Sequence, residues 1–177
     1  MAEEENKSYS IHKSKKSQVD RIMEARESLR KNLESTAHRL ERVLEHEGVE
    51  YISDTRSTDL LSTRDTFKCT LKPIIWLAGS TAHDRDYSLL EKYVKYKIKS
   101  IVVYGPGAED MTLKLKNFVE GMFSETSLEG AVKKSGEIAK RGDVVIFSPS
   151  CAIKDDYDDF AQRGLAFKQI LKRQLGV

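Results

Sequence analysis

The fold is decided by one stretch, Gly142-Asp143-Val144-Val145-Ile146-Phe147-Ser148-Pro149-Ser150-Cys151-Ala152, which Asp159-Phe160-Ala161-Gln162-Arg163-Gly164 follows closely. The four apolar residues 144–147 predict a buried strand. Ser148 and Pro149 end that strand and turn the chain toward a final helix. Because ligands of open α/β sheets gather at the carboxyl ends of strands, this loop is a candidate functional position.

Upstream of this stretch, strand-like and helix-like segments alternate. Strands are expected at 73–77, 100–104 and 143–147, and helices at 57–69, 87–97, 110–118 and 127–140. Ser127 is the expected cap of the helix over 127–140. Such alternation requires crossover connections, so we expect an α/β fold with a mainly parallel, Rossmann-like sheet.

An N-terminal hairpin is expected over residues 42–54. Val43 and Leu44 precede the turn Glu45-His46-Glu47-Gly48, after which Val49, Tyr51 and Ile52 alternate with polar residues. Residues 36–177 contain neither a repeat nor a low-complexity linker. We therefore expect them to form a single domain.

Two segments precede this domain. Residues 1–16 are polar and charged, with a lysine cluster at Lys13, Lys15 and Lys16, and are expected to form a mobile tail. Residues 17–35 contain a helix over 17–34, which Ser17 and Asp20 cap. Its narrow apolar stripe is expected to pack on the domain or, alternatively, to form a homodimer contact; the stripe comprises Val19, Ile22, Met23, Leu29 and Leu33.

The composition excludes several classes of protein. The 177 residues include 30 basic and 28 acidic side chains, a net charge of +2, which is too balanced for a nucleic-acid-binding surface. No run of 18 apolar residues occurs, so no membrane partner is expected. The start of the chain lacks the apolar core of a signal peptide. Cys69 and Cys151 are expected to be reduced thiols of a cytoplasmic protein.

Few residues carry a recognisable chemical motif. The chain has no Gly-x-x-x-x-Gly-Lys-Ser/Thr loop for ATP phosphates. Gly105-Pro106-Gly107 is interpreted as a strand-end turn because Pro106 lacks the amide that a phosphate loop needs. The aspartates at 155, 156, 158 and 159 favour the start of a helix electrostatically. No catalytic residue and no metal site are predicted.

Four motifs in order resemble the C-terminal, amino-acid-binding domain of the Mur ligase family, closest to the members that add D-glutamate. They are Ala37-His38-Arg39-Leu40-Glu41, the segment Gly48–Asp59, Leu77-Ala78-Gly79-Ser80, and the segment Ser148–Gly164. The resemblance covers about residues 25–177 and implies the fold of that domain, a Rossmann-like sheet with an N-terminal β-hairpin.

The resemblance also implies roles for individual residues. Arg39, Asp54 and Arg56 stand at positions that serve the nucleotide and its phosphates. The positions that serve the incoming amino acid are those of Arg56, Thr58, His83, Ile153 and Phe160. In the family, ATP and Mg²⁺ are held by a central domain, so this chain alone is expected to bind no cofactor.

The amino-acid pocket departs from the family pattern. Ala82 and His83 stand where the family has an aspartate and a lysine, so a cation that pairs with substrate carboxylate is lost. Ile153 replaces a serine that helps to hold D-glutamate, and Arg56 replaces a lysine. These changes favour a pocket that has lost its specificity for D-glutamate or binds a different ligand over a pocket that serves D-glutamate transfer.

The sequence leaves two main functions open. In the first, the chain is a stand-alone domain related to enzymes of peptidoglycan and cell-wall synthesis, and acts through a partner or ligand without catalysis of its own. In the second, it is the C-terminal part of a split or larger ATP-dependent D-glutamate ligase, whose central or N-terminal domain lies in another chain. A small nucleotide-binding module unrelated to ligation rests on fold alone.

Overall fold

The computed structural model describes residues 17–34, 38–81, 84–152 and 157–177. The tail over 1–16 lies outside them. Along the chain the elements are α1 (Gln18–Glu34), β1 (Glu41–His46), β2 (Val49–Ser53), α2 (Leu60–Cys69), β3 (Ile74–Gly79), α3 (Ser88–Lys97), β4 (Ile98–Tyr104), α4 (Ala108–Leu115), η1 (Lys116–Phe118), β5 (Gly121–Glu125), α5 (Leu128–Ile138), β6 (Val144–Phe147) and α6 (Phe160–Leu175). This order confirms the expected α/β class.

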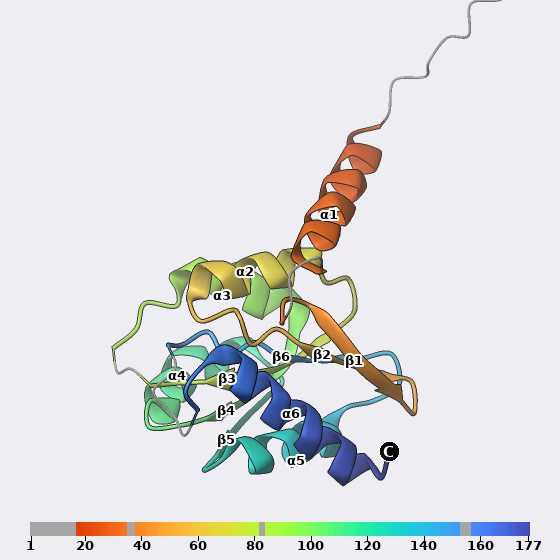
Figure 1. The fold of residues 1–177 in the computed structure, drawn as a ribbon. Helices are drawn as coiled ribbons and strands as arrows, with labels where there is room; N and C mark the ends of the chain where they lie inside the picture. The colour runs from red at the N-terminus through yellow and green to blue at the C-terminus, as the bar shows by residue number, and fades with distance from the viewer. Residues whose placement is uncertain (1–16, 35–37, 82–83, 153–156) are drawn as a thin grey trace, which may run out of the picture.

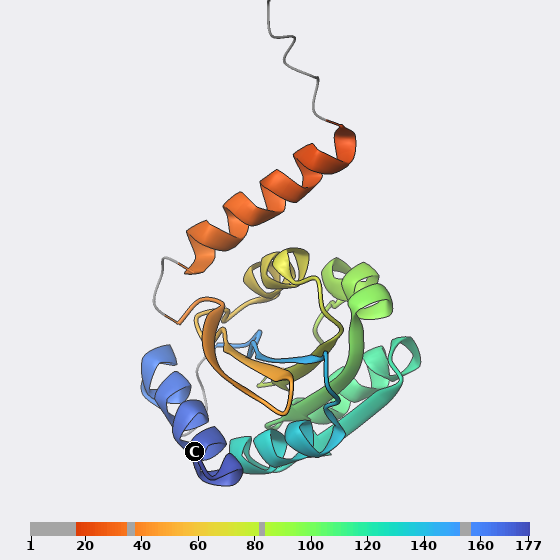
Figure 2. The same cartoon turned by 90° about the vertical axis from the view of Figure 1, so that its right-hand side faces the viewer.

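The strands form one six-stranded sheet with the order β1-β2-β6-β3-β4-β5. The β1–β2 hairpin is antiparallel, and every other neighbouring pair is parallel. Side chains of α2, α3 and α4 pack on one face of the sheet, whereas those of α5 and α6 pack on the other. Figures 1 and 2 show these helices arranged around the sheet. The mainly parallel sheet with an N-terminal hairpin is therefore confirmed.

The core has two layers because the central strands are buried on both faces. On the first face, the rings of Phe67 and Trp76 meet edge to face with their centroids 5.0 Å apart. On the second, the rings of Phe147 and Phe167 lie 5.0 Å apart. Trp76 Nε1 donates a hydrogen bond of 2.7 Å to the Ser148 carbonyl oxygen, which satisfies the buried indole and fixes the end of β6.

The structure corrects several sequence-based boundaries. Strand β5 was not expected, since Gly121-Met122-Phe123-Ser124-Glu125 is short, contains glycine and lies at the sheet edge. The helix expected from Ser57 begins at Leu60, because Asp59 caps it by accepting from the Ser62 amide. The segment over 110–118 is an α-helix followed by a 3-10 turn.

The N-terminal helix is confirmed, but three of the five residues of its stripe are not buried on the domain as expected. Ser17 and Asp20 exchange the reciprocal hydrogen bonds of a capping box. The side chains of Val19, Ile22 and Met23 are nevertheless 67%, 49% and 45% exposed. Figure 1 shows α1 extending beyond the sheet and its helices. None of the described helices is both long and apolar enough to cross a membrane.

We predict that the Phe67–Trp76 contact dominates the stability of the first layer. Phe67→Ala removes a ring with no exposed surface and should lower the free energy of unfolding by about 3–5 kcal/mol. The control Leu113→Ala, at a side chain that is 61% exposed, should change it by less than about 0.5 kcal/mol. Urea denaturation followed by the fluorescence of Trp76, the only tryptophan, measures both. Equal losses would contradict this assignment of the core.

Candidate functional site

The candidate site lies at the carboxyl edge of the sheet, where the ends of β2, β6, β3 and β4 meet. From β2 and β3 the chain continues into α2 and α3 on the first face, whereas from β6 it continues into α6 on the second face. The connections therefore diverge on both sides of β6. Such divergence opens the crevice in which α/β proteins place their ligands.

A buried carboxylate, Asp54, organises one half of this edge. Its side chain has no exposed surface and accepts hydrogen bonds from the Ser57, Thr66 and Ser148 hydroxyls. The Leu40 amide also donates to it at 3.2 Å. These donors come from the loop before β1, the β2–α2 loop, α2 and the end of β6, so one side chain joins four segments.

Arg39 completes this cluster from the same loop as Leu40. Its Nη1 lies 3.6 Å from Asp54 Oδ1 and donates to the Ser57 hydroxyl. Burial raises the pKa of Asp54, and the Arg39 charge together with the hydroxyl donors opposes that rise. The guanidinium thus faces inward in this structure, and the nucleotide role that the resemblance gives to Arg39 and Asp54 stays a prediction.

Arg56 and Phe160 form the exposed part of the site. The guanidinium carbon of Arg56 lies 5.3 Å from the centroid of the Phe160 ring, a cation–π contact between the β2–α2 loop and the first turn of α6. Thr58 lies two residues from Arg56 and donates its amide to the Arg56 carbonyl. The structure therefore brings together two side chains that are 104 positions apart in the sequence and were both expected at the amino-acid pocket.

The Ser148–Cys151 segment connects this part of the edge to β3. The Ser150 amide donates to the Ser57 carbonyl at 2.9 Å, and the Gly79 amide donates to the Pro149 carbonyl at 3.0 Å. Arg85 Nη2 donates to the Ser150 carbonyl at 2.7 Å. Ser150 adopts a left-handed backbone with φ of 57°, which few residues other than glycine adopt without cost. The Ser148–Cys151 segment, which the sequence predicts to be functionally important, is thus held in place by hydrogen bonds to the β2–α2 loop and to β3.

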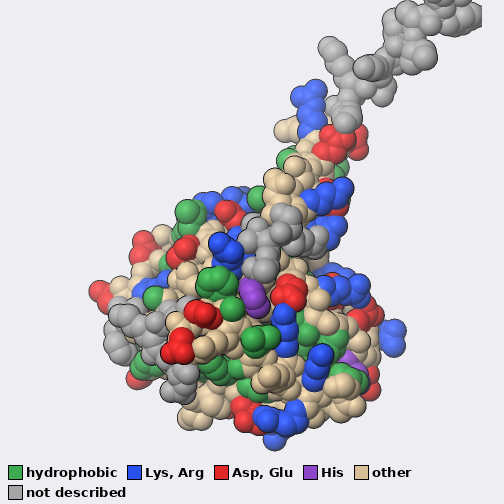
Figure 3. Space-filling view, viewed as in Figure 1, with side chains coloured by type: hydrophobic (Ala, Val, Ile, Leu, Met, Phe, Trp, Pro, Cys, Tyr) green, Lys and Arg blue, Asp and Glu red, His purple; other side chains and the backbone are tan. Residues whose placement is uncertain are grey.

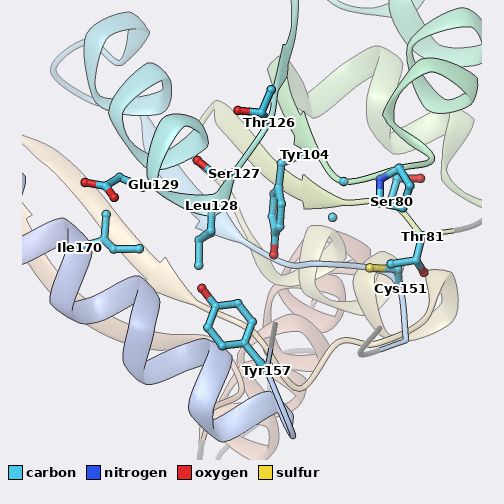
Figure 4. Close-up of a pocket in the computed structure, with 13 residues that line it drawn as sticks. Ser80, Thr81, Tyr104, Thr126, Ser127, Leu128, Glu129, Cys151, Tyr157 and Ile170 are labelled. Carbon is cyan, nitrogen blue, oxygen red and sulfur yellow. The ribbon is translucent and has the colours of Figure 1, made fainter. Parts of the chain in front are cut away.

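A cavity of about 470 Å³ opens beside the Ser148–Cys151 segment, above β3 and β4. Figure 4 shows Tyr104 from the end of β4 and Tyr157 from the segment before α6 pointing their rings into it, with Ser80, Thr81 and Cys151 at one end. Thr126, Ser127 and Glu129 line the opposite end. Hydroxyl groups beside apolar rings suit a small polar ligand better than an apolar one.

Some expected site residues are not placed by the structure, and others were not expected. His83 and Ile153 lie outside the described residues, as do Asp155 and Asp156. Tyr104 and Tyr157 were missed, although an aromatic residue at the end of a buried strand is the signal that could have revealed Tyr104. In the described part of the chain, no group of three or more His, Cys, Asp or Glu side chains is arranged to hold a metal.

The remaining loops behave as structural elements. The Gly107 amide donates to the Ser80 carbonyl at 2.9 Å, which confirms that Gly105-Pro106-Gly107 is a strand-end turn. Gly105 has a φ of 100°, and a Cβ there would lie 2.6 Å from the Ser80 oxygen. Asp159 caps α6 by accepting from the Gln162 amide at 2.8 Å. Cys69 and Cys151 are both free and buried.

Curated ligases are similar to this chain in amino-acid sequence. The UDP-N-acetylmuramoylalanine–D-glutamate ligase of Alkaliphilus metalliredigens is 34% identical over 142 residues, which are 80% of this chain and 31% of that protein. The corresponding ligase of Caldicellulosiruptor saccharolyticus is 33% identical over 141 residues, 78% of this chain and 31% of that protein. The chain thus spans about a third of the length of the curated relatives it matches. No protein-family model matches it.

One solved structure supports the fold independently. A murein peptide ligase of Psychrobacter arcticus, 13% identical, superposes with a TM-score of 0.51 over 79% of this chain and 29% of that protein. Together with the sequence matches, this confirms the resemblance to a Mur ligase domain.

We predict that Arg39 acts on stability through Asp54. Arg39→Ala leaves a buried carboxylate without its cation and should cost about 3–5 kcal/mol near pH 7. In this variant the folded pKa of Asp54, which burial already raises above its unfolded value, rises further because the Arg39 charge no longer opposes burial. The contribution of Asp54 to the free energy of unfolding is then fully present below the pKa of Asp54 in the unfolded chain, and it is lost as the pH rises through the pKa of Asp54 in the folded protein.

The loss relative to the wild type should therefore shrink at about pH 4, near the unfolded pKa of aspartate. Urea denaturation of both proteins at the two pH values measures this change. An identical loss at both pH values would show that the Asp54 charge is not the cause.

Proposed function

We propose that this chain, which the matches relate to the Mur ligases, is a ligand-binding domain of peptidoglycan synthesis that does not catalyse ligation alone. It binds a carboxylate-bearing amino acid or amino-acid-like group at the carboxyl edge of its sheet and acts together with a partner. The proposal is carried by one observation, the exposed Arg56 guanidinium held over the Phe160 ring.

This contact supports carboxylate binding for a physical reason. A guanidinium offers paired N–H donors that match the two oxygens of a carboxylate. Stacking on Phe160 restricts the Arg56 side chain to few conformations, so less entropy is lost when the ligand binds. The cavity on the other side of the Ser148–Cys151 segment, whose lining does not include Arg56, would supply the hydroxyl groups of Thr81 and Tyr104 for the remaining polar atoms.

The ligand class is broader than D-glutamate. Of the family's pocket residues, an aspartate and a lysine are replaced by Ala82 and His83, and a serine by Ile153. A ligand with two carboxylates would lose one cationic partner at this pocket. We therefore propose an amino acid whose recognition rests on Arg56 and on the hydroxyl groups of the cavity.

A partner of this chain, and not the chain itself, would bind ATP and Mg²⁺. The sequence holds no P-loop, and the Gly107 amide, which follows a strand end, is already donated to Ser80. The turn that most resembles a phosphate loop thus has its Gly107 amide already engaged. Residues outside this chain would bind the nucleotide and supply the phosphoryl chemistry in the cytoplasm.

The alternative function is the C-terminal part of a split or larger ATP-dependent D-glutamate ligase. It is favoured by the length of the curated relatives, about three times the matched region. Affinity capture of the tagged chain from its own cytosol, with mass spectrometry, separates the two functions. Recovery of a P-loop protein whose ligase activity needs this chain would support the alternative. Ligation by the purified chain alone would contradict both.

We predict that Arg56 decides ligand affinity. Arg56→Ala should weaken binding of amino acids in a calorimetric titration by at least about tenfold, because a charge-assisted hydrogen bond contributes about 1.5–3 kcal/mol. Phe160→Ala should weaken it less, since it removes only the support of Arg56. Arg42→Ala, at a side chain 57% exposed on β1, is the matched control. An Arg56→Ala variant that binds as tightly as the control would contradict the proposal.

A further inference from the structure

The N-terminal helix α1 presents an apolar surface that its own domain does not cover. At about 100° per residue, Ile22, Arg26, Val19, Arg30 and Met23 fall within an arc of about 100° of the helix surface. The three apolar members of this arc are each close to half exposed or more. An amphipathic helix normally buries such a stripe against another element. The helix thus lacks a partner on this side within the described structure.

A basic groove runs beside the exposed stripe. A cavity of about 400 Å³ separates α1 from α2 and α3, and its apolar lining comes from Ile22, Ala25, Leu29, Tyr93 and Tyr96. The charged side chains that line it are all cationic, namely Arg26, Lys68, Lys92 and Lys97. Figure 2 shows α1 crossing obliquely over the side of the domain formed by α2 and α3. An occupant must therefore offer both apolar and acidic side chains.

The cations of this groove are only partly neutralised. Lys68 pairs with Asp65 at 3.1 Å, and Lys97 donates to the carbonyls of Phe67 and Thr70. Within the described residues, neither Arg26 nor Lys92 has an acidic partner within ion-pair distance. Burial and the Arg26 charge both lower the pKa of Lys97. The groove therefore favours the approach of carboxylates.

The outer border of the stripe on α1 carries carboxylates. Asp20 and Glu27 follow Met23 around the helix within about 60°, on the side away from the groove, where Asp20 also accepts from Ser17 and Glu27 also pairs with Arg30 at 2.8 Å. The helix as a whole is balanced, with four acidic and four basic residues (Asp20, Glu24, Glu27, Glu34; Arg21, Arg26, Arg30, Lys31). Figure 3 shows acidic, basic and apolar side chains interspersed along it. One helix thus offers the apolar and acidic groups that the groove requires.

We propose that α1 pairs in parallel with α1 of a second copy of this chain, around a two-fold axis along the helices. Rotation about such an axis places the Asp20–Glu27 border of each helix beside the basic groove of the other copy. The apolar stripes face each other, and the two domains lie on opposite sides of the helix pair.

An antiparallel pair fits the same surface less well. In an antiparallel pair the Asp20–Glu27 borders of the two copies would face each other, and so would their two basic grooves. The two domains would then lie on the same side of the helix pair. Val19, Ile22, Arg26 and Leu29 also follow the a and d spacing of a coiled coil, in which a polar residue at one a position sets the register. This inference does not depend on the proposed ligand.

Sedimentation velocity of the full chain over a micromolar concentration series tests the pairing. The wild type should reach about twice the 20.1 kDa mass of one chain, whereas Ile22→Glu should remain monomeric over the same series. Leu113→Glu, at an equally apolar and exposed position on α4, is the matched control and should dimerise like the wild type. Circular dichroism confirms that each variant is folded.

Cysteine cross-linking tests the orientation. In a parallel, in-register pair the two copies of residue 19 lie across the axis, so Val19→Cys should form a disulfide-linked dimer under mild oxidation. Ser28→Cys, on the opposite side of α1, is the control and should not cross-link. A wild type that is monomeric throughout, a dimer that survives Ile22→Glu, or a dimer that Val19→Cys cannot cross-link would each overturn the proposal.

Discussion

The carboxylate of Asp54, buried without exposed surface, is the constraint on which the carboxyl edge depends. A charge removed from water must be met by donors and a counter-charge, or the fold loses several kcal/mol. Arg39, Ser57, Thr66 and Ser148 meet this requirement from four different segments. Satisfying one side chain therefore fixes the ends of β2 and β6, the start of β1 and the first turns of α2 relative to one another.

Arg56 owes its position to the same cluster. It lies between Asp54 and Ser57 in the loop that the cluster holds, and its amide donates to the His38 carbonyl at 3.1 Å. Its guanidinium then reaches Phe160 at the start of α6. A rigid loop thus presents one exposed charged side chain that the Phe160 ring holds in place, which is the arrangement expected of a binding group that must be positioned without being buried.

Much of this fold could be predicted from the sequence, because strong local patterns specify it. The run of apolar residues over 144–147 and the capping residues Ser17 and Ser127 act within a few positions of themselves. Strand β5 could not be found in this way, since Gly121–Glu125 becomes a strand only by pairing with β4. Likewise, the polar sequence Ser57-Thr58-Asp59 gives no sign that Ser57 is engaged by Asp54, which delays the start of α2.

The site was predictable only where motifs could be matched. Arg56, Thr58 and Phe160 were expected from the resemblance, but their closeness in space depends on the packing of α6 near the β2–α2 loop. Tyr104 belongs to no motif, and the resemblance gives no role to Tyr157 although it lies in the matched segment Ser148–Gly164; both line one cavity through the arrangement of β4 and the segment before α6. The inward direction of Arg39 follows from the burial of Asp54, which no local pattern reveals.

The central claim is that the carboxyl edge binds the carboxylate of an amino acid through Arg56. The most direct measurement is a titration of the isotope-labelled chain with amino acids, followed through its backbone amide resonances by NMR. We expect saturable shifts confined to the neighbourhoods of Arg56, Thr58, Ser80 and Phe160. Shifts that are absent for every amino acid, or that map to the opposite edge of the sheet, would contradict the account.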